Sequence, residues 1–304
     1  MTASIFIDGE AGTTGLGIRT RLQDLPVTVR SIAPDRRRDP EARLALMREV
    51  DLVVLCLPDD AARESAGLVA SLGADAPRLL DASTAFRTAP DWVYGFEELA
   101  AGQAEAIASA PRVSNPGCYA TGAIALLRPL VDGGLIPADL PLSINAVSGY
   151  SGGGRSMIAA HEATGGPAFL MYGLGLAHKH LPEITTHARL RTPPVFVPSV
   201  GHFAQGMIVS IPLHLAQLGG PSATDLLDCL QAHYAGCDAV SVVQAAPDLT
   251  AETLAGSDRM ELSVHAGTSG AHALLTARLD NLGKGASGAA LQNIRLMLGL
   301  RSAR

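Results

Sequence analysis

The sequence is poor in charged residues and in cysteine, and each shortage excludes a class of protein. Only 17% of its 304 residues are charged, and the formal net charge is −6. A mildly acidic chain has no bulk attraction to nucleic acid or to anionic lipid. The four cysteines form no C-x-x-C pair, so neither a zinc ribbon nor a thioredoxin-type motif is expected. We predict no metal site and no nucleic-acid or membrane partner.

Long apolar runs are also absent. The chain opens with MTASIFIDGE, which has no basic region and only a three-residue apolar stretch before Asp8. A secretory leader needs both features, and a membrane helix needs about 18 apolar residues in a row. We therefore expect a cytoplasmic protein, whose cysteines are free thiols in a reducing compartment.

The chain is rich in apolar residues, at 47%, and contains 32 glycines and 19 prolines. This composition predicts a large core with many tight turns, and the length favours two domains. Near the N-terminus strands alternate with helices, which indicates a doubly wound parallel sheet. The strands are expected over 4–7, 27–32 and 51–57, and the helices over 16–24 and 40–49, the second capped by Asp39.

From about residue 118 the pattern changes to one strong helix, over 119–131, followed by glycine-rich loops and longer apolar strands. These strands are expected over 140–148, 194–200, 206–214, 239–244 and 272–279. A turn over 283–288 precedes a last helix over 289–298. The predicted fold class is α/β: an N-terminal Rossmann-type parallel sheet, then an α+β domain with a largely antiparallel mixed sheet.

The loop after the first strand reads G-E-A-G-T-T-G over residues 9–15 and opens a helix. Glycines let the backbone turn tightly and approach a pyrophosphate, while a helix N-terminus offers N–H groups and positive potential. A glycine-rich turn without a ligand is the alternative. We predict a dinucleotide site with contacts from Gly9, Ala11, Gly12, Thr13, Thr14 and Gly15.

Three arginines after the second strand favour NADP(H) over NAD. NAD binders usually place an acid near the end of this strand, but here Asp35 is followed by Arg36, Arg37 and Arg38. Guanidinium groups can hold a 2′-phosphate, although a solvated basic run is the alternative. We predict Arg36 and Arg37 as cofactor contacts.

The stretch S-N-P-G-C-Y-A-T-G over 114–122 carries the strongest chemical signal. Ser114 or Asn115 can cap a helix with Pro116 in its first turn, which puts Cys118 in that turn as well. Unpaired N–H groups and the positive end of the helix dipole favour a thiolate there. We predict that Cys118 is a nucleophile; the alternative is a small core residue.

A nucleotide loop, a helix-start cysteine and a largely β second domain, in this order, resemble the glyceraldehyde-phosphate and aspartate-semialdehyde dehydrogenase superfamily. Finer motifs, spread in one order over nearly the whole chain, resemble the shorter type of N-acetyl-gamma-glutamyl-phosphate reductase. They are DGEAGTTG at 8–15, CLPDDAARE at 56–64, DASTAFR at 81–87, SNPGCYATG at 114–122, SGYSGGGR at 148–155, HKHLPE at 178–183, PSVGHFAQGM at 198–207 and DNLGKGASGAALQN at 280–293.

The resemblance implies NADPH-dependent reduction of N-acetyl-gamma-glutamyl phosphate to N-acetylglutamate 5-semialdehyde in arginine biosynthesis, with phosphate release through a cysteine thioester. It also implies a homo-oligomer, either a dimer or a tetramer. The expected domains are 1–117 with 286–304 for NADP, and 118–285 for catalysis and oligomerisation.

The resemblance further implies residue roles for the cofactor. Cys56, Leu57 and Pro58, at the end of the third strand, are expected to contact the cofactor, although the Cys56 thiol is interpreted as structural. Asn281 and Lys284 lie in the turn that resembles the segment touching the nicotinamide.

For proton transfer, His178 and His180 flank Lys179 and would share one face of an extended segment. By resemblance this segment lies at the active site, so His180 is the predicted acid/base, with His178 and Glu183 at the substrate. His202 is the rival, because aspartate-semialdehyde relatives use a similar Gly-His.

Substrate anions need cations and N–H donors. The expected contacts are Arg87, Asn115, Ser151, Gly152 and Arg155, the last beside a glycine nest. Either arginine can instead be a surface ion-pair residue.

Several rival functions remain open. One is aspartate semialdehyde dehydrogenase, and another is a reductase of a carrier-protein-linked acyl phosphate, which would need a basic docking surface. Two different classes are a cofactor-free thiol hydrolase and a non-catalytic nucleotide sensor. The first leaves the N-terminal glycine loop unexplained, and the second leaves Cys118 and the histidines unexplained.

Overall fold

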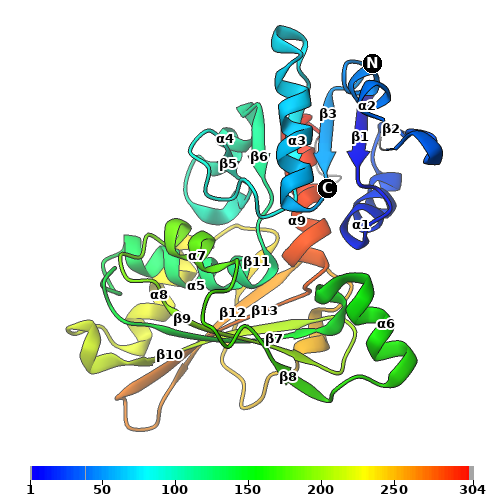
Figure 1. Ribbon diagram of the computed structural model, residues 1–304. Helices are drawn as coiled ribbons and strands as arrows, with labels where there is room; N and C mark the ends of the chain where they lie inside the picture. Colours follow the sequence, from blue (N-terminus) through cyan, green and yellow to red (C-terminus); the bar gives the residue numbers. More distant parts are fainter. Residues whose placement is uncertain (1, 38, 301–304) are drawn as a thin grey trace. The chain divides into compact units, whose positions relative to one another are not determined.

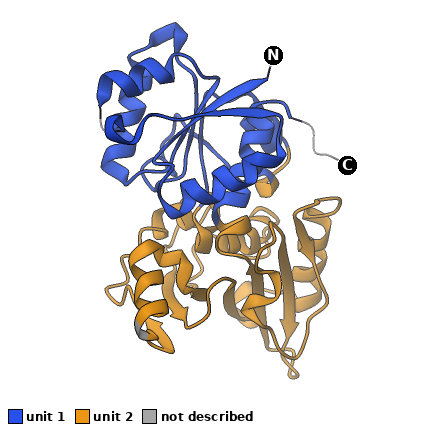
Figure 2. Cartoon of the chain, turned by 90° about the vertical axis from the view of Figure 1, so that its right-hand side faces the viewer, with its two compact units in different colours: residues 1–97, 102–116, 286–304 blue, residues 98–101, 117–285 orange. Residues whose placement is uncertain are grey.

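The computed structural model describes residues 2–37 and 39–300, so that Arg38 and the end of the expected 286–304 segment lie outside it. The chain divides into two compact units (Figure 2). The first comprises Met1–Glu97, Gly102–Pro116 and Ala286–Arg304, and the second comprises Glu98–Ala101 and Gly117–Gly285. Each unit contains one sheet (Figure 1).

The first unit is built on a six-stranded sheet in which every neighbouring pair is parallel, in the order β2-β1-β3-β4-β6-β5. Its strands are β1 (Ala3–Asp8), β2 (Val27–Arg30), β3 (Leu52–Leu55), β4 (Arg78–Asp81), β5 (Val93–Tyr94) and β6 (Arg112–Ser114). Its helices are α1 (Thr13–Arg21), α2 (Pro40–Met47), α3 (Asp59–Ala70), α4 (Gln103–Ser109) and α9 (Gly288–Met297).

Alternating side chains of these strands enter two different cores, which explains their continuous apolar runs. Ile5 and Ile7 of β1 pack with α1, α4 and α9 on one face, whereas Phe6 packs with α2 and α3 on the other. The predicted Rossmann-type sheet is thereby confirmed. The predicted cap of α2 is also confirmed, because Asp39 accepts hydrogen bonds from the N–H groups of Glu41 and Ala42.

The second unit is built on a seven-stranded mixed sheet in the order β11-β12-β13-β10-β7-β9-β8. The pairs β11–β12 and β7–β9 are parallel and the other pairs are antiparallel, as predicted. Its strands are β7 (Ser143–Gly149), β8 (Phe169–Met171), β9 (Val195–Gly201), β10 (Met207–His214), β11 (Val240–Val242), β12 (Met260–Ala266) and β13 (His272–Leu279).

Helices of the second unit gather on one face of this sheet. They are α5 (Cys118–Asp132), α7 (Leu181–His187) and α8 (Ala223–His233), whereas α6 (Gly154–Thr164) follows β7 (Figure 1). The buried helix α5 crosses β10 and β13 closely, because Gly122 has no side chain: a Cβ there would lie 2.9 Å from Val209 Cγ2. This close packing fixes the start of α5, where Cys118 lies.

The structure differs from the sequence prediction in both units and at the last turn. In the first unit, the strands β4, β5 and β6 and the helices α3 and α4 were not predicted. Strands β8 and β12 and the helices α6, α7 and α8 were not predicted, because their apolar positions are few or interrupted by polar residues. The expected turn over 283–288 is a π-helical turn, Gly283–Ser287, which continues into α9. In the described part of the chain, no helix combines the length and the apolar character needed to span a bilayer.

Candidate active site

Cys118 is the first residue of α5, but the predicted cap of that helix was wrong. The N-cap residue is Gly117, and no side chain caps the helix in the way expected of Ser114 or Asn115. Pro116 precedes the cap rather than lying in the first turn. The Gly117 carbonyl accepts from the Thr121 N–H at 2.8 Å, the first intrahelical hydrogen bond that an N-cap residue makes. The thiol is therefore carried by the positive end of α5.

A carboxylate from α7 holds the cap residue. Glu183 is 1% exposed, and its Oε1 accepts from the Gly117 N–H at 2.7 Å. A buried carboxylate needs such partners, and a charge-assisted bond to a backbone N–H is stronger than a neutral one. The structure thus gives Glu183 a contact with the backbone next to Cys118, which sequence spacing did not predict.

The two histidines of the HKH motif lie in a turn, not in the extended segment that was considered. His180 is the N-cap residue of α7 in a helical conformation, and its N–H donates to His178 Nδ1 at 3.1 Å. The two rings meet edge to face with centroids 4.8 Å apart. His180 is buried, with 4% of its surface exposed.

Burial and, to a smaller extent, the charge of Lys179 lower the pKa of His178 to about 4, while Glu183 opposes the shift. His178 is consequently neutral at neutral pH, in agreement with an Nδ1 that accepts a hydrogen bond. A neutral ring with Nδ1 as acceptor carries its proton on Nε2. His178 is therefore not the source of a proton from an imidazolium at neutral pH.

Tyr119 follows Cys118 in the chain, and its ring lies near the rings of His178 and His180. Its ring centroid lies 6.0 Å from that of His178 and 5.8 Å from that of His180. Its hydroxyl donates to the Ser199 carbonyl at 2.9 Å and accepts from the Tyr172 hydroxyl at 3.3 Å.

The tyrosine hydroxyls are neutral groups in this site. Burial raises the pKa of Tyr172 to about 12; the hydrogen bond to Tyr119 opposes that shift, and the charge of a Cys118 thiolate adds to it. The pKa of Tyr119 is raised even further, mainly by burial.

The thiol, two tyrosines and two histidines thus form one cluster in the second unit. The sequence analysis did not predict either tyrosine as a member of this cluster. Tyr119 had a signal, its place after Cys118, whereas Tyr172 had none.

The 283–287 turn lies against Cys118. A Cβ at Gly285 would be 2.9 Å from Cys118 Cβ and 3.3 Å from Cys118 Cα. The neighbouring Lys284 is 1% exposed, and its Nζ donates to both carboxylate oxygens of Glu98, at 2.8 and 2.7 Å.

Asn281 is also buried, and its amide joins two loops. Its Nδ2 donates to Ser151 Oγ at 2.9 Å, and its Oδ1 accepts from the Gly206 N–H at 2.9 Å. Ser151 is buried, Gly152 is exposed beside it, and Arg155 is exposed in the first turn of α6. The structure therefore brings Asn281, Ser151 and Gly152 together, while Arg155 lies on the surface.

His202 belongs to a second cluster. It is exposed, and its Nδ1 lies 2.8 Å from His161 Nδ1. The His161 ring stacks on Tyr150 with centroids 4.6 Å apart and on His202 at 5.1 Å. The two candidate acid/base histidines thus have different neighbours.

In the first unit, the predicted nucleotide loop connects β1 to α1. Gly9 has φ +92°, and a Cβ there would lie 2.3 Å from the Cys56 carbonyl oxygen and 3.1 Å from Leu57 Cδ2. Gly12 is the N-cap of α1, with neither a side-chain cap nor an acid in the first turn. Thr13, Thr14 and Gly15 begin the helix, and Pro58 is the N-cap residue of α3. Burial raises the pKa of the Cys56 thiol to about 12, which opposes any role as a nucleophile.

The arginines predicted to read a 2′-phosphate hold carboxylates. Arg37 Nη2 donates to Glu10 Oε1 at 2.9 Å, and Arg36 Nη2 donates to Asp39 Oδ2 at 2.8 Å. Glu10 lies in the glycine loop and also accepts from Ser31 Oγ at 2.9 Å. Both arginine side chains are largely exposed.

Arg87 is buried, with 8% of its surface exposed, so it is not the surface residue of the alternative interpretation. Its Nε donates to the Asn115 carbonyl at 3.0 Å. The Asn115 side chain donates to the Ala286 carbonyl and accepts from Asn293 Nδ2, both at 3.0 Å. Arg87 and Asn115 thus form a connected pair in the first unit.

Family models match both units. Residues 28–110 match the model described as "Semialdehyde dehydrogenase, NAD binding domain", and residues 118–281 match "Semialdehyde dehydrogenase, dimerisation domain". Aspartate semialdehyde dehydrogenase II from Vibrio cholerae has the same fold, with a TM-score of 0.72 and 18% identity over 99% of each chain. The enzyme from Francisella tularensis gives a TM-score of 0.73 with 12% identity, over 98% of this chain and 100% of that one.

Closer similarity is found to N-acetyl-gamma-glutamyl-phosphate reductases. The protein from Brucella ovis is 52% identical over 98% of this chain and 100% of its own length. The protein from Chelativorans sp. is 51% identical over 99% of this chain and 100% of its own length. With identity at this level over both units, the chain belongs to the N-acetyl-gamma-glutamyl-phosphate reductase family of the semialdehyde dehydrogenases.

Proposed function

We propose that this chain catalyses the NADPH-dependent reduction of N-acetyl-gamma-glutamyl phosphate to N-acetylglutamate 5-semialdehyde, a cytoplasmic step of arginine biosynthesis. One acyl phosphate, one NADPH and one proton give the semialdehyde, inorganic phosphate and NADP. The observation that carries the proposal is Cys118 at the start of α5, next to Tyr119, whose ring lies near the His178 and His180 rings, in a chain of this family.

Cys118 is the proposed nucleophile. Its thiolate attacks the acyl carbon, and the carbon–oxygen bond to phosphate breaks, which leaves a thioester on Sγ. The N–H groups of the first turn of α5 stabilise negative charge that develops near them. When the thioester has been reduced, the carbon–sulfur bond breaks and the aldehyde departs.

His180 is the proposed acid/base. It gives a proton to the oxygen of the reacting carbon on reduction, and it takes that proton back when the carbon–sulfur bond breaks. His178 fixes the backbone of His180 through their 3.1 Å hydrogen bond. His202 is the second candidate for this role, in the His161 cluster.

NADPH, when bound, supplies the hydride that reduces the thioester carbon. The residues proposed to hold the cofactor fit it, because α1 begins at Gly12 with no side-chain cap and no acid, and so offers N–H groups to a pyrophosphate. The proposed contacts are Gly9, Ala11, Gly12, Thr13, Thr14, Gly15, Arg36, Arg37, Cys56, Leu57, Pro58, Asn281 and Lys284.

Substrate contacts are proposed in each unit. Arg87 and Asn115 of the first unit offer a buried guanidinium and an amide for phosphate oxygens. Ser151, Gly152 and Arg155 of the second unit offer a hydroxyl, a backbone N–H and a cation. His178 and Glu183 are proposed to complete the substrate contacts in the second unit.

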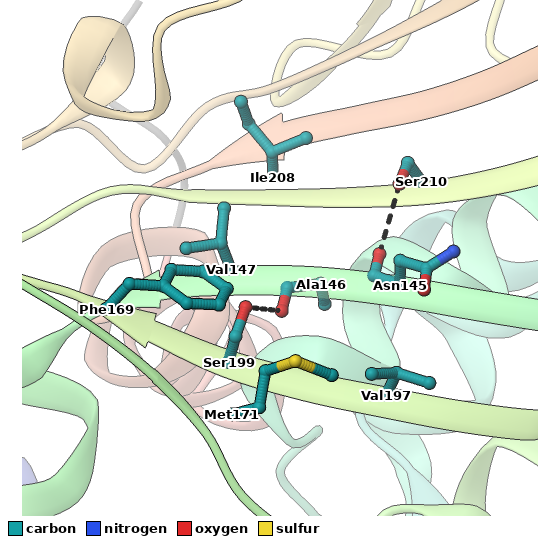
Figure 3. A pocket seen from close by; sticks show the side chains of 9 residues that line it. All are labelled: Asn145, Ala146, Val147, Phe169, Met171, Val197, Ser199, Ile208 and Ser210. Carbon is teal, nitrogen blue, oxygen red and sulfur yellow. Dashed lines mark hydrogen bonds between the residues drawn. The ribbon is translucent and has the colours of Figure 1, made fainter.

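The second unit is proposed to assemble into a homodimer or a tetramer through the sheet face opposite α5. Figure 3 shows Phe169 and Met171 of β8 beside Val147 and Val197 on this face, around a cavity of about 330 Å³. Phe169 is 58% exposed and Met171 is 48% exposed. An apolar surface of this kind is typical of an interface between protein chains.

A reverse-direction assay tests the proposed function. NADPH formation is followed by absorbance with NADP, phosphate and N-acetylglutamate semialdehyde, and a parallel assay contains aspartate semialdehyde. We expect turnover on the acetylated substrate only. Turnover on aspartate semialdehyde alone would move the chain to the sibling activity, and silence on both with NADP still bound would contradict the proposal.

Cofactor choice is tested by the double variant Arg36→Ala/Arg37→Ala. We expect NADP affinity to fall by roughly tenfold and NAD affinity to change little, because only NADP carries the 2′-phosphate that the two guanidiniums neutralise. Titration of each cofactor by calorimetry measures both affinities. Equal weakening of the two would contradict this assignment.

A further inference from the structure

The turn over 283–287 is tightly packed beside Cys118, the proposed nucleophile. A Cβ at Gly285 would contact Cys118 at 2.9 Å, and a Cβ at Gly283 would lie 2.0 Å from the Ser257 carbonyl oxygen. The Gly285 N–H donates to the Asp280 carbonyl at 2.9 Å. Since there is no room for even a Cβ between Gly285 and Cys118, a shift of the turn changes the space into which Sγ can rotate.

The residue between these two glycines reaches a buried carboxylate. Lys284 Nζ lies 2.8 and 2.7 Å from the two oxygens of Glu98, and the side chains are only 2% and 6% exposed. A buried charge is stable only with its partner, and removal of one partner costs far more than the loss of an exposed pair. This ion pair therefore ties the turn firmly to Glu98.

Glu98 is itself held by the second unit. The segment Glu98–Ala101 belongs to that unit, although the chain on both sides of it belongs to the first unit. Its backbone carbonyl oxygen lies 3.0 Å from His233 Nε2, at the end of α8. The carboxylate thus has an anchor that does not depend on the turn.

We propose that the Glu98–Lys284 ion pair positions the nucleophile by holding the turn against Cys118. The inference rests on the proposed reductase function and adds a requirement to it: Sγ must approach the acyl carbon from one direction. Misplacement of a reacting group by about 1 Å can cost a hundredfold in rate. In this role neither Glu98 nor the Lys284 ammonium touches the reacting atoms.

The test uses four variants of the full chain. Glu98→Gln and Lys284→Met each remove one charge, and the double variant removes both. Asp132→Asn is the control, because it removes the ion pairs with Arg128 and Arg189 at the opposite end of α5, where Oδ2 lies 2.6 Å from Arg128 Nε and Oδ1 lies 2.9 Å from Arg189 Nη1. For each variant, we measure Tm, the reverse-direction kcat and KM per folded molecule, and the rate of Cys118 alkylation by iodoacetamide, mapped by mass spectrometry.

We expect each single variant to lower kcat at least about tenfold, with KM changed less than about threefold. Alkylation of Cys118 should be at least as fast as in the wild type, because a small reagent does not need one direction of approach. The double variant should recover much of the lost Tm, since no unpaired charge stays buried, while kcat remains low.

Two outcomes would overturn the inference. One is recovery of kcat together with Tm in the double variant, which would make the ion pair purely structural. The other is a kcat in the single variants equal to that of Asp132→Asn. Failure of the proposed function looks different, because the wild-type enzyme would then be silent in the reverse assay while its Cys118 is still alkylated.

Discussion

The second unit contains two clusters of histidines around a tyrosine, and they differ in what the ring nitrogens do. Around Tyr119, His178 Nδ1 accepts a backbone N–H, and the neighbouring residue in the chain is Cys118. Around Tyr150, the Nδ1 atoms of His161 and His202 lie 2.8 Å apart, so one ring must donate and the other accept.

Residue type alone does not identify a catalytic histidine. Both clusters contain two imidazoles packed on a tyrosine, and each contains a histidine that was an acid/base candidate from the sequence. The Tyr119 cluster packs at the start of α5, where Glu183 also holds the backbone of Gly117. In the Tyr150 cluster, one nitrogen of each ring is occupied by the other ring. The geometry therefore favours His180 over His202 as the acid/base.

The largest expected effect separates these two histidines. His180→Asn should lower kcat by roughly 10²–10⁴-fold, the usual contribution of general acid–base catalysis, while His202→Asn should change it less than about threefold. Steady-state assays in the reverse direction measure both values. A larger loss of kcat in His202→Asn than in His180→Asn would assign the acid/base role to His202.

A smaller effect is expected from the two tyrosines. Tyr119→Phe removes a hydroxyl that donates to the Ser199 carbonyl and accepts from Tyr172, so buried groups lose their partner at a cost of about 1–3 kcal/mol. Tyr150→Phe keeps the ring that stacks on His161, and should cost less than about 0.5 kcal/mol. Urea unfolding measures both changes, and equal losses would remove this distinction between the clusters.

The smallest effect concerns pH. Burial holds the pKa of His178 near 4, below its usual 6.5, so the unfolded chain binds more protons than the folded chain between these values. Above about pH 6.5, His178 should therefore not reduce the free energy of unfolding. Below that pH, the free energy of unfolding should fall as the pH drops towards 4.

His178→Gln should flatten that decline, because the side chain no longer takes up a proton on unfolding. The free energy of unfolding, measured by urea titration across this pH range, checks the slope. Between about pH 7 and 9, above the window, the slopes of variant and wild type should agree. An unchanged slope at acidic pH would show that other groups cause the decline.

The parallel sheet of the first unit could be predicted from β1, β2 and β3, whereas β4, β5 and β6 were not predicted. Both faces of this sheet are buried, so a central strand such as β3 reads as a continuous apolar run. In the second unit one face is exposed, and β8 carries apolar residues with exposed side chains over only three positions. Such a short strand has no periodicity that distinguishes it from a loop.

Long-range partners account for the remaining differences at the candidate site. Cys118 was predicted at a helix start from local signals, but the carboxylate that holds Gly117 lies 66 residues later in the chain. Glu98 and Lys284 are 186 residues apart. Local motifs predict caps and turns, whereas pairs of this kind depend on the tertiary fold and leave no sequence pattern.

The most direct test of the account is to trap its covalent intermediate. The enzyme is mixed with N-acetyl-gamma-glutamyl phosphate without cofactor, quenched in acid and digested, and the peptide that contains Cys118 is examined by mass spectrometry. We expect an N-acetylglutamyl group on Cys118 and phosphate released in equal amount, with neither in Cys118→Ser. Phosphate release without acylation of Cys118, or full turnover by Cys118→Ser, would contradict it.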